Sequence, residues 1–180
     1  MTDYRVPDPY AALPDLPALE VSSESFAEGA TLVAAQLGGV MGVEGGLDKS
    51  PQVSWNAGPE GTKSYTVTVF DPDAPTASGF WHWSVANIPA DTTSLAEGAC
   101  TGTDTSGLPD GAVVVRNDAG FKGFVGAAPP AGHGPHRYIL AVHAVGDVLE
   151  LGDDASCAFV GFNLFAQALA RGTYTGVYEQ

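Results

Sequence analysis

Two short segments of the sequence concentrate side chains that could hold a small anion or a metal ion. The first is Asp71–Pro75, which reads Asp-Pro-Asp-Ala-Pro and leads within a few residues to His82 between two tryptophans. The second is Pro129–Tyr138, a run of prolines, glycines and histidines that ends on an arginine and a tyrosine. Prolines stiffen both segments, and stiff loops hold side chains at the fixed angles that a small polar site requires.

The chemistry of these groups favours binding of a small anion. If the strands that carry them are neighbours, Asp71, His82, His136 and Tyr138 converge. Two imidazoles and a phenol can donate hydrogen bonds to an anion, and the histidines add positive charge when they are protonated. The carboxylate is expected to favour the charged form of a neighbouring histidine and to fix its tautomer. Each feature alone fits an ordinary turn or a packed core, but their joint appearance indicates a site.

A metal enzyme is the alternative that uses the same residue types. His82, His136 and Asp71 could form the two-histidine, one-carboxylate set that holds iron, and His133-x-x-His136 has the spacing of a ligand pair. That pair lies in a proline- and glycine-rich loop with no neighbouring glutamate, unlike the helices of zinc proteases. Asp71-x-Asp73 resembles the start of an EF-hand loop, but proline and threonine follow where a ligand and a glycine are needed. No serine nucleophile motif is present, so we expect no catalytic residue, no bound metal and no cofactor.

The elements that must position these groups are β-strands. Apolar segments alternate with Gly, Pro, Asp and Asn along the sequence, which is typical of a β-rich domain. One helix is expected over Ala155–Arg171, begun by Asp153 or Asp154 and ended by Gly172. Its broad apolar stripe contains Phe159, Phe162, Leu164, Phe165, Ala168 and Leu169. Strands are expected at Leu19–Val21, Gln52–Trp55, Ser64–Phe70, Phe80–Ile88, Ala112–Val115, His136–Val145 and Thr173–Tyr178.

Strand alternation assigns the candidate side chains to faces of the sheet. In the strand that begins at His136, this residue and Tyr138 share one face, while Arg137 and His143 point to the other. In the preceding aromatic strand, alternation places Phe80, His82 and Ser84 on one face and Trp81 and Trp83 on the opposite face. The candidate anion-binding groups therefore belong to one side of each strand.

Charge and length restrict the classes of partner. The chain has 180 residues with 7 basic and 21 acidic side chains, which gives a net charge of −14 at pH 7. Such a charge repels nucleic-acid phosphates and anionic lipids, so neither a nucleic-acid partner nor stable membrane insertion is expected. The length predicts a single domain over residues 19–180, preceded by a proline-rich arm over residues 1–18.

Targeting and redox signals indicate a cytoplasmic protein. The N-terminal residues are acidic and proline-rich, unlike a signal peptide, and no apolar run approaches the roughly 18 residues of a membrane span. Cys100 and Cys157 have no CxxC neighbour, so we expect two buried free thiols in a reducing compartment.

At the two chemical segments the sequence resembles the phosphatidylethanolamine-binding protein family, in its bacterial branch of small single-domain members. The first family motif is Asp-Pro-Asp-Ala-Pro followed by an aromatic strand with a histidine, which matches Asp71–Pro75 and Trp81–Trp83. The second is Gly-x-His-Arg-Tyr, which matches Gly134–Tyr138. The order and separation of the motifs agree, and the resemblance extends from about Leu19 to the end of the sequence.

The resemblance implies a fold and a pocket. The fold is a mainly β, two-sheet antiparallel β-sandwich with a few peripheral helices. The pocket lies at the surface and accepts a small anionic ligand such as phosphate, acetate or a phosphorylated head group. Matched position by position, its ligand-binding residues are Asp71, His82, Pro130, Gly134, His136 and Tyr138.

The resemblance also implies roles and leaves alternatives open. Family members that inhibit kinases or serine proteases suggest a modulator that binds such a protein partner, and bacterial relatives suggest a homodimer. The alternatives are a hydrolase or metal-dependent enzyme that uses the same Asp, His, His and Tyr side chains, and a purely structural role. Contacts for that third role could come from exposed aromatics or from Gly38–Gly46, a five-glycine segment expected to be a mobile loop.

Overall fold

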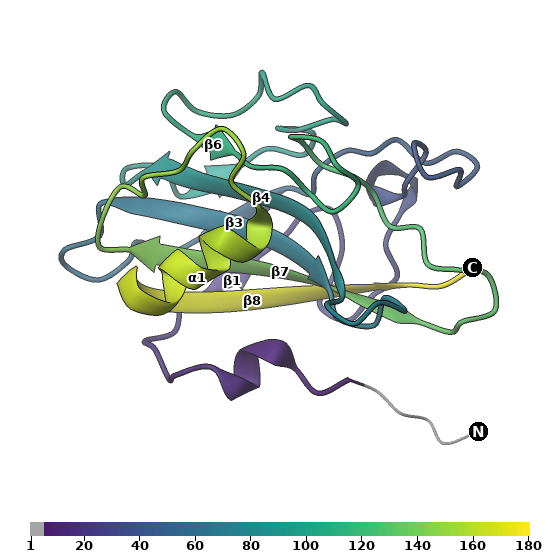
Figure 1. Cartoon of the computed structure of the whole chain (residues 1–180), viewed down its shortest axis with the longest axis horizontal. Helices are drawn as coiled ribbons and strands as arrows, with labels where there is room; N and C mark the ends of the chain where they lie inside the picture. Colours follow the sequence, from purple (N-terminus) through teal and green to yellow (C-terminus); the bar gives the residue numbers. More distant parts are fainter. Residues whose placement is uncertain (1–5) are drawn as a thin grey trace.

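Two antiparallel sheets pack face to face in the computed structural model, which describes residues 6–180 (Figure 1). The expected antiparallel β-sandwich is therefore confirmed. The larger sheet has the strand order β6-β4-β3-β7-β8, and the smaller has the order β1-β2-β5. The strands are β1 (Val21–Ser22), β2 (Val53–Trp55), β3 (Ser64–Asp71), β4 (Phe80–Pro89), β5 (Ser94–Leu95), β6 (Val113–Val114), β7 (His136–Val145) and β8 (Ala168–Tyr178).

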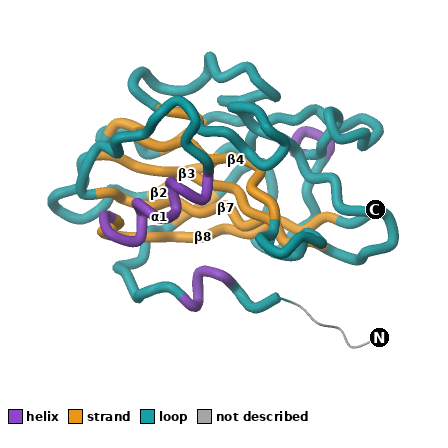
Figure 2. The backbone as a smooth tube through the Cα atoms, in the orientation of Figure 1, coloured by secondary structure: helices purple, strands orange, loops and turns teal. Residues whose placement is uncertain are grey.

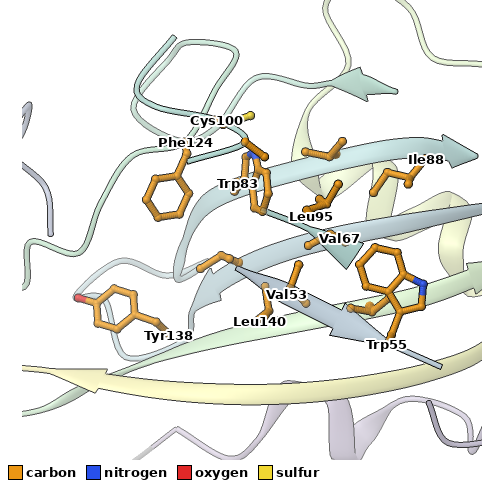
Figure 3. Close-up of a cluster of buried hydrophobic side chains, with 14 of the residues drawn as sticks. Val53, Trp55, Val67, Trp83, Ile88, Leu95, Cys100, Phe124, Tyr138 and Leu140 are labelled. Atoms are coloured by element: carbon orange, nitrogen blue, oxygen red, sulfur yellow. The ribbon is translucent and has the colours of Figure 1, made fainter. Parts of the chain in front are cut away.

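The core lies between the sheets (Figure 3). Val53 and Trp55 of β2 face Val67 on the central strand β3, and Trp83 of β4 completes the layer. Every residue of β3 is buried, because the smaller sheet covers its inner face and other elements cover its outer face. Period-two sequences of β-branched and aromatic residues suit a strand of this kind.

The outer face of the larger sheet is the one turned away from the smaller sheet. Helix α1 (Cys157–Gln167) and the N-terminal segment, residues 6–17, cover it (Figure 1). The N-terminal segment contains a 3-10 helix at Pro9–Ala12, and a second 3-10 helix lies at Ala34–Gln36. The segment is tied to β8 by the Arg171 amide, which donates to the Pro17 carbonyl over 3.0 Å. Residues 1–5 of the expected proline-rich arm lie outside the described residues.

The helix differs from the sequence prediction at both ends. Ser156, not Asp153 or Asp154, caps it, because the Ser156 hydroxyl accepts from the Phe159 amide over 3.2 Å. The chain passes directly from α1 into β8, as Figure 2 shows. The change occurs at Ala168 because pairing with β7 begins there, so that hydrogen bonds between strands replace those of the helix. Gly172 therefore lies within β8, where a side chain would collide with the Leu19 carbonyl, and it is not a helix terminator.

The apolar stripe predicted for the helix is only partly buried. Leu164 is buried with Cys157 and Val160, but the three phenylalanines of α1 are exposed. Burial of one narrow strip is enough to hold a helix of 11 residues on a sheet, so the remaining apolar positions stay in solvent. Their exposed fractions are Phe159 45%, Phe162 72% and Phe165 71%.

Both cysteines are free and buried, as the sequence predicts. Burial raises the pKa of the Cys100 thiol to about 11 and that of Cys157 to about 12, so neither thiol is a reactive thiolate near neutral pH. Among residues 6–180 no helix has the length and apolar character needed to cross a bilayer.

Candidate functional site

A cavity of about 140 Å³ lies where the end of β3 meets the starts of β4 and β7. Five of the six ligand-binding residues expected from the sequence line it: Asp71, His82, Pro130, His136 and Tyr138. The lining does not include Gly134, which stands in the turn before β7 with φ of 89°. That left-handed conformation suits glycine, so the structural contribution of Gly134 is to direct the chain into β7.

Three side chains form a hydrogen-bonded row at the wall of the cavity. Nδ1 of His136 lies 2.7 Å from Oδ2 of Asp71, and Nε2 of the same ring lies 2.8 Å from Nδ1 of His133. Asp71 also accepts from the Asp73 amide, which fixes the carboxylate at the start of the turn. Burial raises the pKa of Asp71, while the hydrogen bond and charge of His136 act in the opposite direction. The row therefore fixes the orientation of His136 by using both ring nitrogens.

His82 lies beside the row but stays neutral. Its Nδ1 is 2.8 Å from the Val125 carbonyl oxygen, so Nδ1 carries the proton and Nε2 is bare in the neutral ring. Burial lowers the pKa of His82 to about 4, and hydrogen bonds to Val125 and Gly126 only partly oppose it. The expected carboxylate partner is therefore present for His136, whereas the His82 ring is buried without one and its low pKa opposes protonation.

A β-bulge explains why His82 reaches the cavity. Val69 pairs with Trp83 and Phe70 pairs with Trp81, so His82 is the extra residue on β4. Trp83 consequently lies in the inter-sheet core, while Trp81 packs against Phe70 in a tilted arrangement with ring centroids 4.3 Å apart. Simple alternation, which placed Trp81 and Trp83 on one face, is wrong at this point because the bulge shifts the period by one residue.

Tyr138 supplies an unused hydroxyl. Its oxygen is buried and has no hydrogen-bond partner within residues 6–180, and its ring meets His82 edge-on with centroids 5.1 Å apart. Burial, followed by the charge of Asp71, raises the pKa of Tyr138, so the group is a neutral donor. A buried hydroxyl without a partner loses solvation free energy, which an incoming acceptor restores.

An ion pair joins the two chemical segments. Asp73 accepts from Nη2 and Nε of Arg137 at 2.7 and 2.8 Å, and from the Arg137 amide at 2.9 Å. Burial alone would raise the pKa of Asp73, but the Arg137 hydrogen bonds and charge outweigh it and lower the pKa. This fork-to-carboxylate geometry locks the turn after β3 against β7. The separation of Asp71 from His136 is therefore set by the backbone as well as by their own hydrogen bond.

Sequence reasoning missed the far wall of the cavity. Met41 lines it from the glycine-rich segment Gly38–Gly46, and Gly126 lines it from the loop before the second motif. The glycine-rich segment is not a free loop: its Gly38 amide donates to the Ala127 carbonyl over 2.8 Å. Buried Asp48 ties the two loops together by accepting from the Val40 amide and the Gly126 amide, both at 2.8 Å. A cluster of glycines followed closely by an aspartate is the sequence signal for such close backbone approach.

Asp48→Ala is expected to lower the free energy of unfolding by about 2–4 kcal/mol, because two charge-assisted hydrogen bonds are lost and alanine is strained at φ of 49°. Asp48→Asn should lose less, since asparagine tolerates that conformation and keeps an acceptor oxygen. Urea denaturation measures both. Stability of the alanine variant within about 0.5 kcal/mol of the wild type would show that the loops hold together without this carboxylate.

The metal-enzyme alternative receives no geometric support. Within residues 6–180 no group of three or more His, Cys, Asp or Glu side chains is arranged to hold a metal ion. Both nitrogens of His136 already face Asp71 and His133, and the protonated nitrogen of His82 faces a carbonyl. These nitrogen atoms already have hydrogen-bond partners, so metal coordination would require the side chains to rearrange.

The fold and the cavity together define an antiparallel β-sandwich with a small polar site at one strand end. A family model described as phosphatidylethanolamine-binding protein matches residues 22–179. YbcL of Escherichia coli (strain K12) is 45% identical over 163 residues, which cover 90% of this chain and 88% of that protein. Its crystal structure superposes with a TM-score of 0.85 at 44% identity and covers 90% of this chain and 98% of that chain. The chain therefore belongs to the phosphatidylethanolamine-binding protein family.

A second relative supports the same assignment. YbhB of E. coli (strain K12) is 46% identical over 131 residues, which cover 72% of this chain and 81% of that protein. The residues matched by the family model begin at Ser22 and so include both chemical motifs and every strand from β2 onward.

Proposed function

We propose that the Asp71–Tyr138 cavity binds one oxyanion group of a small ligand, such as phosphate, acetate or a phosphorylated head group. The observation that carries the proposal is the buried Tyr138 hydroxyl, which has no partner among the described residues and lines a cavity beside His82 and the Asp71–His136 pair. Membership of a family described as phosphatidylethanolamine-binding supports an oxyanion of the phosphate type.

The donors and acceptors of the cavity select a protonated oxyanion. Tyr138 can donate one hydrogen bond to a ligand oxygen. Neutral His82 offers a bare Nε2, which accepts a proton from a ligand hydroxyl or from solvent as the ligand enters. The nearby Asp71 carboxylate would repel a fully ionised dianion, whereas its hydrogen bond from His136 moderates that repulsion for a monoanion. The site therefore suits a monoanion that binds together with one proton, which either the ligand or solvent supplies.

The ligand could be free or attached to a protein. Segments on both sides of the cavity are exposed, including Pro75–Ser78 and Pro130–His133, so a phosphorylated side chain of a kinase or protease partner has access. Modulation of such a partner would follow from occupation of the cavity by that side chain. The same cavity binds the free anion in the absence of a partner.

Binding is tested by titrating phosphoethanolamine into ¹⁵N-labelled protein, with ethanolamine as the control that lacks the oxyanion. Tyr138→Phe should weaken binding about tenfold to a hundredfold, because it removes one hydrogen bond to a charged group without adding a void. His136→Ala and Asp71→Asn should also weaken it, while Tyr174→Phe, a matched change outside the cavity, should not. Equal affinity of all four variants and the wild type would refute the proposal.

Anion affinity is expected to fall as pH rises. Burial lowers the pKa of His82 to about 4, so the ring is neutral near neutral pH, and a bound anion favours its protonated form. Acetate carries no proton near neutral pH, so its binding draws one from solvent, and above the bound-state pKa of His82 the affinity falls up to about tenfold per pH unit. Calorimetry in buffers of different ionisation enthalpy counts the protons taken up. Affinity that stays constant from mildly acidic to mildly alkaline pH contradicts this linkage.

A further inference from the structure

A second and larger cavity, of about 410 Å³, lies on the opposite face of the five-stranded sheet. Its floor is the outer face of β3, β4 and β7, where Phe70 points away from the side occupied by its neighbour Asp71. One wall is helix α1 and the other is the N-terminal segment that runs below β8 in Figure 1. The lining is mainly apolar and aromatic, and includes Tyr10, Leu13, Phe70, Trp81, Leu164 and Phe165.

Two polar side chains stand together in this apolar cavity. Arg171 and His143 are directly paired across β8 and β7, so both side chains project from the same face of the sheet. His143 is buried, and its Nδ1 has no hydrogen-bond partner among residues 6–180. Burial and, to a smaller extent, the charge of Arg171 lower the pKa of His143 to about 3, so the ring is a neutral hydrogen-bonding group.

Arg171 is a cation without an acid. Among the described residues no carboxylate lies within ion-pair distance of it, although the chain carries 21 acidic side chains. Its hydrogen bonds use Nη2 alone, to the carbonyls of Tyr10 and Pro14 at 3.4 and 3.3 Å, and its guanidinium carbon lies 5.7 Å from the Tyr10 ring centroid. The nearby Asp8 turns its carboxylate to the Tyr10 amide at 2.8 Å. The guanidinium therefore keeps donors available toward the cavity.

We propose that this second cavity binds a small apolar monocarboxylate, with the acid group at Arg171 and His143 and the apolar body against the floor of the sheet. A carboxylate supplies the negative charge that Arg171 lacks and an acceptor for the neutral imidazole. The aromatic and aliphatic lining matches a hydrocarbon body, because burial of apolar surface stabilises the complex. An ammonium ligand would be repelled by Arg171, and a neutral alcohol would leave the guanidinium without a counter-charge.

The position of the cavity makes this proposal independent of the oxyanion site. The two cavities share no lining residue and lie on opposite faces of the five-stranded sheet. His136→Ala should therefore leave octanoate binding to the second cavity unchanged, while it weakens the binding of phosphoethanolamine to the Asp71–Tyr138 cavity.

The test uses octanoate, 1-octanol and octylammonium, which share one apolar body and differ in the head group. Each is titrated into the full-length ¹⁵N-labelled protein. Octanoate is expected to bind at least about tenfold more tightly than 1-octanol, with the largest amide shifts in α1, β8 and the N-terminal segment, and octylammonium should bind most weakly. Equal affinity for the three probes, no binding of octanoate, or shifts centred on the Asp71 cavity would overturn the proposal.

Substitutions at Arg171 and Gly161 test the charge of the cavity and its space separately. Arg171→Met should reduce octanoate affinity to that of 1-octanol, whereas Arg171→Lys should keep the preference, and Arg116→Met is the matched control outside the cavity. Gly161→Phe should abolish binding of every probe by filling the cavity, since a β-carbon at this helical position meets no atom within 4 Å. Unchanged octanoate binding in Arg171→Met or Gly161→Phe would refute the site. A sedimenting dimer that Gly161→Phe dissociates would instead show that a second copy of the chain fills the cavity, and would also refute it.

Discussion

Gly126→Ala is expected to destabilise the protein by at least about 3 kcal/mol and to disrupt the oxyanion cavity. A β-carbon at Gly126 would overlap the carbonyl group of Leu37 and lie 2.5 Å from the Gly38 amide nitrogen. All of these atoms are backbone, so no side-chain rotation relieves the collision. Overpacking of a rigid interior usually costs about 1–3 kcal/mol, and a collision with backbone belongs at or above the upper end of that range.

The backbone around Gly126 has little freedom to move away. The Gly126 amide donates to the Asp48 carboxylate. The Ala127 amide donates to the Gln36 carbonyl over 2.9 Å, and the Ala127 carbonyl accepts from the Gly38 amide. Separation of the two loops, around Gly38 and around Gly126, would break these hydrogen bonds and leave buried polar groups without partners. Because Gly126 and Met41 line the oxyanion cavity from these two loops, the same shift would change its shape.

Gly161→Ala is the matched control for this substitution. Gly161 is in the middle of α1, where an added β-carbon meets no atom within 4 Å. Alanine there should stabilise the protein by about 0.5–1 kcal/mol, because it restricts the unfolded chain and favours helix. Urea denaturation of the two variants should therefore give shifts of opposite sign. Gly126→Ala with wild-type stability and unchanged phosphoethanolamine affinity would disprove the close backbone approach.

The strands and most of the oxyanion site could be predicted because their signals are local. Period-two alternation defined β3, and a run that is apolar at both odd and even positions defined β7. Each chemical motif lies directly at the end or start of one of these strands. Once β3 and β7 pair, Asp71 and His136 must meet, because the two strands are antiparallel neighbours. The wrong assignments came from non-local causes. The bulge at His82 depends on how β4 registers with β3, which no property of the β4 sequence alone determines.

Exposure was harder to predict than element type. The three phenylalanines of α1 have helical spacing and so indicated a buried stripe, but the strip that contacts the sheet is formed by Cys157, Val160 and Leu164. Hydrophobic periodicity counts apolar residues and does not show how much surface the neighbouring elements cover. The Gly38–Gly46 segment forms no helix or strand, as expected, but its close approach to Gly126 could not be predicted, because the two lie far apart in the sequence.

The free energy of unfolding is expected to fall steeply as the pH is lowered, and His143 accounts for part of that slope. The pKa of His143 is 6.5 in an unfolded chain and about 3 in the folded protein, and that of His82 falls from 6.5 to about 4. Between these limits the unfolded chain binds protons that the folded protein does not, so stability is full above pH 6.5 and is lost as pH falls. Each histidine contributes about 1.4 kcal/mol of unfolding free energy per pH unit in this range.

His143→Leu isolates the contribution of one ring. The substitution removes a buried nitrogen that has no partner among the described residues, so stability at neutral pH should stay the same or rise. Between about pH 4 and pH 6 the slope of unfolding free energy against pH should decrease by about 1.4 kcal/mol per unit, because one fewer proton is taken up on unfolding. Asp71, whose raised pKa acts in the opposite direction, is common to both proteins and cancels in the difference. Gly161→Ala should shift the curve without changing its slope, since it alters no titrating group. Urea denaturation measured across this pH range gives the slopes. Parallel curves for His143→Leu and the wild type would contradict the prediction, because His143 would then be protonated in the folded state and accessible to water.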